Sequence, residues 1–236
     1  MKKKNFIFSA AVLFMASAMV VSCAGDDMTS ETTNGKNVVT AKAILDGTTR
    51  VAYNENTSGG GITATWESDD YLNALETNSG TTTHCTFTNP TIDTDPVVFK
   101  STDAEATSDA TTWKAVLGKG AKVSGTTITC GYDGQVGTPA NLENYDYRVA
   151  TGTDKAPTFN FSGSETRLTY FLRLKVPAGI KQIEVCTGSW TITSTANTAP
   201  TASTDNVSTV TLASTSTAPQ IVYVAVPAID FSTVGL

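Results

Sequence analysis

The sequence predicts an all-β protein of the sandwich or barrel type, and three observations lead to this fold class. Threonine is very frequent and stands with Val, Ile, Tyr and Phe, which favour strands. Short runs of alternating apolar residues recur along the chain, as expected for sandwiches and barrels. Clusters of Gly, Pro, Asn and Asp separate these runs and are typical of turns.

The start of the chain has the features of a lipoprotein signal peptide over residues 1–22. Lys2–Lys4 precede an apolar run over 6–21, which is short for a membrane span and long for a signal core. The run ends in Val20-Val21-Ser22-Cys23, which resembles the lipobox of bacterial lipoproteins. Two or three acyl chains anchor a protein stably, so we expect Cys23 to carry the lipid that holds the mature chain in the outer membrane. An ordinary secretory signal or an uncleaved anchor helix is the alternative.

The residues after Cys23 predict the compartment. The segment Ala24-Gly25-Asp26-Asp27 contains an acidic pair and looks like the surface-export signal of Bacteroidetes lipoproteins. We therefore expect a lipid-anchored protein of the cell outer membrane, exposed on the surface or part of a fimbrium. The alternative is that Asp26 and Asp27 only begin a solvated tether. Residues 23–37 are polar and lack periodicity, which is typical of a flexible tether.

The charge balance excludes one large class of partners. The chain carries 16 basic and 22 acidic residues, and three of the lysines lie in the predicted signal peptide. No basic run follows these lysines. An acidic chain of this kind is a poor ligand for a phosphate backbone. We therefore expect no nucleic-acid partner.

Strand patterns begin at residue 38. Val39, Ala41 and Ala43 alternate with other residues and share one face, and Ile62 and Trp66 share a face of the next strand. Further strand-like runs follow at 83–88, 96–100, 112–118, 121–132 and 147–151.

The strongest apolar patterns come late in the sequence. Leu168, Tyr170, Leu172 and Leu174 alternate before a stop at 177–179, and 221–231 is typical of a buried strand that Pro227 ends. Between them, 194–219 is rich in Ser, Thr, Ala and Pro and fits either a flexible linker or an exposed edge hairpin. A new apolar strand begins at the end of the chain without a partner. This predicts either a truncated sequence or a strand that is supplied from elsewhere.

Three cysteines remain after Cys23. Cys85, Cys130 and Cys186 lie in strand-like stretches without C-x-x-C spacing, which favours buried free thiols over a zinc site. A Cys85–Cys130 disulfide is the alternative. The single histidine, His84, precedes Cys85, and adjacent strand residues point to opposite faces. A catalytic dyad of these two side chains is therefore disfavoured.

Motifs for catalysis or cofactor binding are missing from the sequence. It contains no GxSxG, P-loop or dinucleotide-binding pattern. Glu67, Asp69 and Asp70 provide carboxylates, but a pair such as Asp69-Asp70 is more typical of a turn. We expect a protein that is not an enzyme and needs neither a cofactor nor a metal ion.

The order of several short motifs resembles the fimbrillin-like lipoproteins of Bacteroidales. The likeness covers most of the chain. The matching segments are the lipobox with its acidic pair, Thr49-Arg50, 62–70 (ITATWESDD), 145–151 (YDYRVAT), 159–161 (FNF), 168–177 (LTYFLRLKVP), 183–185 (IEV) and 222–232 (VYVAVPAIDFS). Three features depart from the family pattern: Ser68 replaces a glycine, Phe161-Ser162 lacks a histidine, and the C-terminal strands of the family are missing.

The resemblance implies tandem transthyretin-like Greek-key β-sandwich domains over 38–156 and 157–236, the second apparently incomplete. It further implies a fimbrial (pilus) stalk, anchor or tip adhesin whose partners are other fimbrial subunits and host or bacterial surface ligands. In that family a trypsin-like protease cleaves stalk subunits after an arginine of the first strand, and a neighbouring subunit's strand fills the groove by β-augmentation. Arg50 is the matching position here; the alternative is a solvated arginine at a strand end.

A surface glycan-binding lipoprotein of a polysaccharide-uptake system is the alternative function. Such proteins present exposed aromatic platforms on loops. Trp66 and Trp113 fall within strand patterns and are expected in the core. Trp190 begins a strand, and the pattern does not show whether it is buried or exposed. The tryptophans therefore favour assembly over sugar binding.

Overall fold

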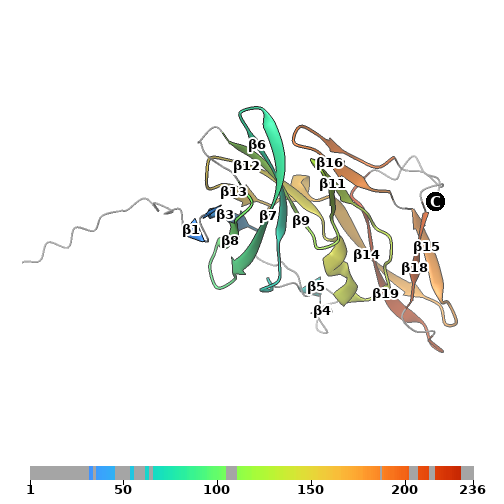
Figure 1. Ribbon diagram of the computed structural model, residues 1–236. Coiled ribbons are helices and arrows are strands. Elements are labelled where there is room, and N and C mark those ends of the chain that lie inside the picture. Colours follow the sequence, from blue (N-terminus) through green and yellow to red (C-terminus); the bar gives the residue numbers. More distant parts are fainter. Residues whose placement is uncertain are drawn as a thin grey trace, which may run out of the picture.

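The computed structural model describes residues 32–33, 36–45, 54–55, 62–63, 66–104, 111–186, 188–201, 207–212 and 216–229. These residues form strands and two short 3-10 helices, which confirms the all-β fold class (Figure 1). The strands are β1 (Thr32–Thr33), β2 (Lys36–Asn37), β3 (Val39–Ile44), β4 (Asn54–Glu55), β5 (Ile62–Thr63), β6 (Leu72–Asn78), β7 (Thr81–Thr91), β8 (Val97–Ser101), β9 (Thr112–Leu117), β10 (Lys122–Ser124), β11 (Thr127–Cys130), β12 (Arg148–Thr153), β13 (Thr158–Asn160), β14 (Thr169–Val176), β15 (Gln182–Cys186), β16 (Trp190–Ile192), β17 (Asn197–Thr198), β18 (Val207–Thr211) and β19 (Gln220–Pro227). The helices are η1 (Pro139–Tyr145) and η2 (Ser164–Thr166).

The N-terminal half folds as a sandwich made from one curved sheet, which we name the first sandwich. Its strand order is β12-β9-β6-β7-β8-β3-β13. The long strand β7 pairs with β6 before Thr88 and with β8 from Thr88 on, with a register shift between Thr88 and Thr91. An irregularity of this kind bends and twists a strand. Strand β7 therefore belongs to both layers, and the end strands β12 and β13 lie close together.

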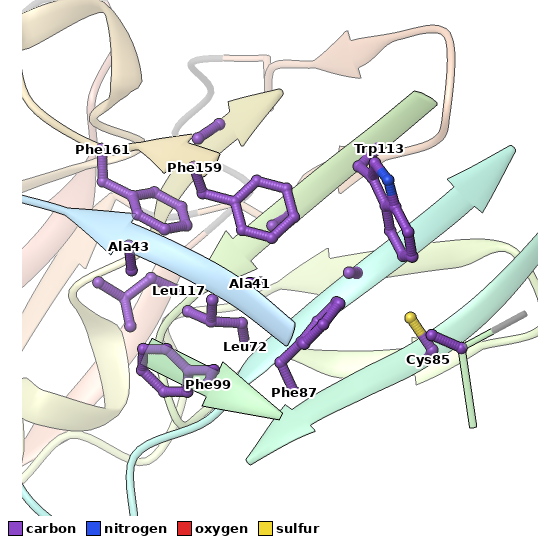
Figure 2. Packing of buried hydrophobic residues seen from close by; sticks show 14 of the residues in the cluster. Ala41, Ala43, Leu72, Cys85, Phe87, Phe99, Trp113, Leu117, Phe159 and Phe161 are labelled. Atoms are coloured by element: carbon purple, nitrogen blue, oxygen red, sulfur yellow. The ribbon is translucent and has the colours of Figure 1, made fainter. Parts of the chain in front are cut away.

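The two layers of the first sandwich enclose one hydrophobic cluster, the first core. Figure 2 shows its phenylalanines, Trp113 and smaller side chains pointing toward one another from both layers. Phe87 packs edge-to-face on Trp113 and Phe159, at ring centroid distances of 5.5 and 6.0 Å. The members are Val39, Ala41, Ala43, Leu72, Ala74, Cys85, Phe87, Val97, Phe99, Ala104, Trp113, Ala115, Leu117, Ala150, Phe159 and Phe161.

One layer of the first sandwich is covered on its inner face and on part of its outer face. Ala74 and Ala115 point into the first core, whereas their neighbours Leu75 and Val116 belong to a second cluster on the outer face, the middle cluster. Strands β11 and β16, helix η1 and strand β19 cover that outer face. The members are Leu75, Val116, Ile128, Cys130, Tyr132, Leu142, Tyr145, Tyr147, Val149, Leu168, Ile192, Tyr223 and Ala225.

The C-terminal part contains a smaller sandwich, which we name the second sandwich. Its two sheets are the antiparallel pairs β14-β19 and β15-β18. They enclose a second core of Val176, Val210, Leu212, Val222, Val224 and Val226. Strand β19 is almost continuously buried, as the apolar run of the sequence predicts. Strand β18 shows that part of 194–219 is a strand and not a linker.

Several strands pair across the predicted domain boundary at 156–157. Strand β13 joins the first sandwich through parallel pairing with β3. Strands β10 and β11, which precede the boundary, form one sheet with β16 and β17, which follow it. Within the predicted tether 23–37, the structure describes the strand pair β1-β2. The domain limits themselves stay a prediction.

The cysteine prediction is confirmed for two residues. Cys85 and Cys130 are buried free thiols, one in the first core and one in the middle cluster. Burial raises the pKa of the Cys130 thiol to about 12, which keeps it protonated and unreactive. The alternative, a Cys85–Cys130 disulfide, is therefore wrong. The side chain of Cys186 lies outside the described residues.

Candidate assembly surface

In the second sandwich, apolar side chains on the inner face of strand β14 are partly exposed to solvent. Side chains alternate along β14, so Tyr170 and Leu172 lie on the same face as Val176 of the second core. They stand opposite Val226 and Val224 of β19, which are buried. Tyr170 is nevertheless 52% exposed and Leu172 39% exposed. The inner face of β14 is therefore covered at one end of the strand and open at the other.

The inner-face side chains of strand β15 are also incompletely covered. Ile183 and Val185 pair with Val210 and Ser208 of β18 and pack against the second core, but both stay only partly buried. Among the described strands, β14 pairs with β19 alone and β15 with β18 alone. Strands β14 and β15 thus form one side of the sandwich, which we name the open side.

The opposite side is closed by Gln135. Its amide oxygen accepts a hydrogen bond from Ala225 N–H at 2.6 Å, and its amide nitrogen donates to Ala225 C=O at 2.8 Å. Its backbone C=O accepts the N–H of Thr211 at 3.1 Å. One residue therefore bonds the edge of β19 in one sheet and the edge of β18 in the other. Strands β14 and β15 must lie together on the far side, because the short segment 135–137 reaches both of their partners.

Gly137 completes this closure. Its C=O accepts the N–H of Tyr223 at 2.9 Å. Its φ is +74°, and a Cβ at this position would lie 2.7 Å from Val222 and 2.9 Å from Leu212. Only glycine combines this backbone conformation with so close an approach. The closing segment is thus fitted to the second core, whereas the open side has no such cover among the described residues.

Asp69 lies in a turn, as the sequence predicts. Together with Glu67 and Asp70 it surrounds Lys119, a residue that the sequence did not single out. Lys119 Nζ lies 3.1 Å from Asp69, 3.3 Å from Glu67 and 3.7 Å from Asp70. Asp70 is buried, and its other carboxylate oxygen accepts Glu67 N–H at 2.8 Å. Burial raises the pKa of Asp70 to about 7. Glu143 of η1 lies 3.9 Å from the ammonium of Lys119, so the group ties the turn before β6 to η1.

His84 and Cys85 point to opposite faces, as the sequence predicts. Cys85 is fully buried in the first core, and half-buried His84 Nε2 lies 3.1 Å from Asn73 Oδ1 on the outer face. Burial lowers the pKa of His84. The two side chains therefore form no dyad. Within the described ranges, no group of three or more His, Cys, Asp or Glu residues is placed to hold a metal ion.

Trp66 and Trp113 pack in or against the first core, as the sequence predicts, and the structure also places Trp190, which the sequence left open. Trp113 is buried and Trp66 packs on Phe99 at a centroid distance of 5.5 Å, while Trp190 is half-buried beside the middle cluster. None of the three is an exposed platform for a sugar.

The predicted lipidation and processing residues lie outside the described residues. These are Cys23, the export segment Ala24, Gly25, Asp26 and Asp27, and the cleavage candidate Arg50. Their roles stay predictions. No helix in the described part of the chain has the length and apolar character that a membrane span requires.

Comparisons with known proteins give one distant structural likeness. No family model matches the chain, and no curated protein matches its sequence. The fold is similar to the crystal structure of a "putative cell adhesion protein" from Bacteroides uniformis, with a TM-score of 0.46 and 14% identity over 84% of this chain and 76% of the other. A likeness of this size does not carry the function of one protein to the other.

Proposed function

We propose that this chain is a surface-exposed lipoprotein that serves as a fimbrial subunit, anchor or adhesin and assembles by β-strand exchange. The observation that carries the proposal is the open side of the second sandwich. Keeping apolar side chains of the inner face in contact with water costs free energy. An added strand from a neighbouring subunit would cover Tyr170 and Leu172.

The added strand would bind by β-augmentation. Main-chain hydrogen bonds to an edge strand supply affinity, and alternate side chains of the added strand fill the apolar face. Covering one large apolar side chain contributes about 1.5–3 kcal/mol. Several such contacts along one strand support a stable contact between subunits, while the mobile partner pays an entropic cost for becoming ordered.

The position of β3 fits the proteolytic step that the fimbrillin resemblance implies. Strand β3 lies between β8 and β13, and its Ala41 and Ala43 are buried in the first core. In the proposal, cleavage after Arg50 releases β3 from this place. The first sandwich would then offer a second groove, with β8 on one side and β13 on the other.

A pair of matched substitutions tests the assembly surface. Leu172 on β14 is 39% exposed and Val123 on β10 is 36% exposed, and each strand stands at the end of its sheet. The full chain, extracted in detergent, is treated with a trypsin-like protease, and its mass is followed by light scattering. We expect the wild type and Val123→Lys to form oligomers and Leu172→Lys to stay monomeric, because a charge on the apolar inner face opposes an added strand.

The same assay addresses maturation and the alternative function. Arg50→Ala should block both the trimming and the assembly. Wild-type protein that stays monomeric after trimming, or Leu172→Lys that assembles as well as Val123→Lys, would contradict the proposal. A monomer that binds polysaccharide at Trp190, with binding lost in Trp190→Ala, would favour the glycan-uptake alternative instead.

A further inference from the structure

A polar cleft of about 460 Å³ lies over the outer face of the first sandwich. Its floor is made of two cross-strand rows. Thr153, Thr112 and Thr77 stand opposite one another on β12, β9 and β6, and Thr151, Lys114 and Leu75 form the next row. Directly paired residues on one face of a sheet have neighbouring side chains. The strand pairing therefore places three threonine hydroxyls beside a row that contains one ammonium group.

Lys114 is the unusual member of the cleft. Only 8% of the residue is exposed, and its side chain makes no hydrogen bond or ion pair with any residue that the structure describes. Burial lowers the pKa of its ammonium group. Lys119, by contrast, is surrounded by carboxylates. The ammonium nitrogen of Lys114 is not among the buried side-chain atoms that lack a partner, so it reaches the cleft. In this partly desolvated place an ion pair with an anion is stronger than it would be in bulk water.

Several hydroxyl groups line the same cleft as this cation. The lining includes the hydroxyls of Thr77, Thr112, Thr151, Thr153, Thr158 and Ser194. Ser194 comes from the turn between β16 and β17, and its Oγ accepts a hydrogen bond from Thr82 at 3.3 Å. Asp154 lines the mouth of the cleft, and its carboxylate accepts the hydroxyl of Thr153 at 3.4 Å. Each hydroxyl can both donate and accept, which suits a ligand that carries several hydroxyls.

We propose that this cleft binds a small polyhydroxylated carboxylate of the uronic acid type. The ligand carboxylate pairs with Lys114 Nζ, and the ligand hydroxyls bond to the surrounding threonines. A charge-assisted bond to the carboxylate is stronger than a bond to a neutral hydroxyl. The volume lies within the range of small-molecule sites, about 300–1,000 Å³.

Other ligands match the cleft less well. A neutral sugar would leave the ammonium of Lys114 unpaired, and sugar stacking is prevented because Trp113 is buried in the first core. The chain has a net charge of −6, so its overall field does not attract anions over long distances. Recognition therefore depends on the contacts within the cleft. These contacts share no residue with the open side, so the inference is independent of the assembly proposal.

Titration of the full chain with two sugars of the same shape tests whether the cleft recognises the ligand carboxylate. Calorimetry or saturation-transfer NMR in detergent compares galacturonate with galactose at constant ionic strength. We expect galacturonate to bind at least about tenfold more tightly. The variant Lys114→Met keeps the apolar stem and should weaken galacturonate binding by at least about tenfold, while Lys122→Met, at an exposed lysine of β10, should leave it unchanged.

Two further variants keep the test decisive if Lys114→Met fails to fold. Lys114→Arg retains the charge and should retain binding, and Thr112→Val should weaken it about two- to tenfold through loss of one neutral hydrogen bond. Circular dichroism melts check the fold of each variant. Equal binding of galactose and galacturonate, equal binding by the wild type and Lys114→Met, or no saturable binding of galacturonate at about 10 mM, a weak limit for a specific site, would overturn the proposal.

Discussion

The two sandwiches use the same alternating pattern of apolar residues, but one is closed and the other is open. Among the residues that the structure describes, the first sandwich has seven paired strands around a core of 16 buried residues. The described part of the second has two pairs of strands around six buried residues. In the first, Phe87 and Phe159 are completely buried, whereas in the second, Tyr170 and Leu172 stand on the inner face and remain exposed.

The difference shows that alternation determines which face of a strand is apolar, but the number of neighbouring strands determines whether that face is covered. Strand β13 closes the first sandwich at one end by parallel pairing with β3. The second sandwich is closed on one side by one three-residue segment, 135–137. Three predictions test this contrast, from the largest expected effect to the smallest.

The first prediction compares a large aromatic side chain in each sandwich. Phe87→Ala should lower the free energy of unfolding by about 3–5 kcal/mol, because it leaves a cavity in a closed core. Tyr170→Ala should cost less than about 1 kcal/mol, because that ring already stands half in water. Urea unfolding followed by tryptophan fluorescence measures both values. Similar losses for the two variants would remove the distinction between a closed and an open sandwich.

The second prediction separates the two sides of the second sandwich. Gln135→Ala leaves the buried N–H and C=O groups of Ala225 without their partner and should cost about 2–4 kcal/mol. Hydrogen exchange should rise most in β18 and β19, while β6 and β9 of the first sandwich keep their protection. A uniform rise through both sandwiches would mean that they open as one unit and that Gln135 does not close the second one separately.

The third prediction concerns a buried carboxyl that distinguishes the first sandwich from the apolar second core. Burial raises the pKa of Asp70 from its ordinary value of 3.8 to about 7. The folded state therefore holds a proton that the unfolded state has lost between these pH values, and stability should fall as the pH rises through this window. The expected loss in wild type is about 1–3 kcal/mol, less than the full shift corresponds to, because water and nearby groups relax around the charged carboxylate.

The variant Asp70→Asn checks this assignment. In the wild type, the N–H of Glu67 donates a hydrogen bond to the carboxylate of Asp70 at 2.8 Å. The side-chain amide oxygen in the variant can accept the same hydrogen bond. We expect a flatter stability profile between pH 4 and pH 8, with the largest gain over wild type at the alkaline end. Thermal melts across this pH range measure it. If the two profiles run parallel, the pH dependence of the wild type arises from other groups.

The sequence by itself determined the fold class and many of the strands. Val39, Ala41 and Ala43 alternate in the sequence and are buried in β3, and the apolar run of β19 is buried as expected. The separation of His84 from Cys85 and the burial of two free thiols also followed from strand geometry. These properties are local, because the two-residue period of a strand decides them.

Only the tertiary structure decided what covers each face. Ala115 and Val116 look alike in the sequence, yet one points into the first core and the other meets a different sheet. Gln135 closes β19 across 90 residues of sequence, and Lys119 meets Glu67 across 52. Lys114 has no ion-pair partner among the described residues, because strand pairing places Leu75 and threonines beside it. Such contacts depend on strand order and on the packing of layers, which the local apolar pattern does not specify.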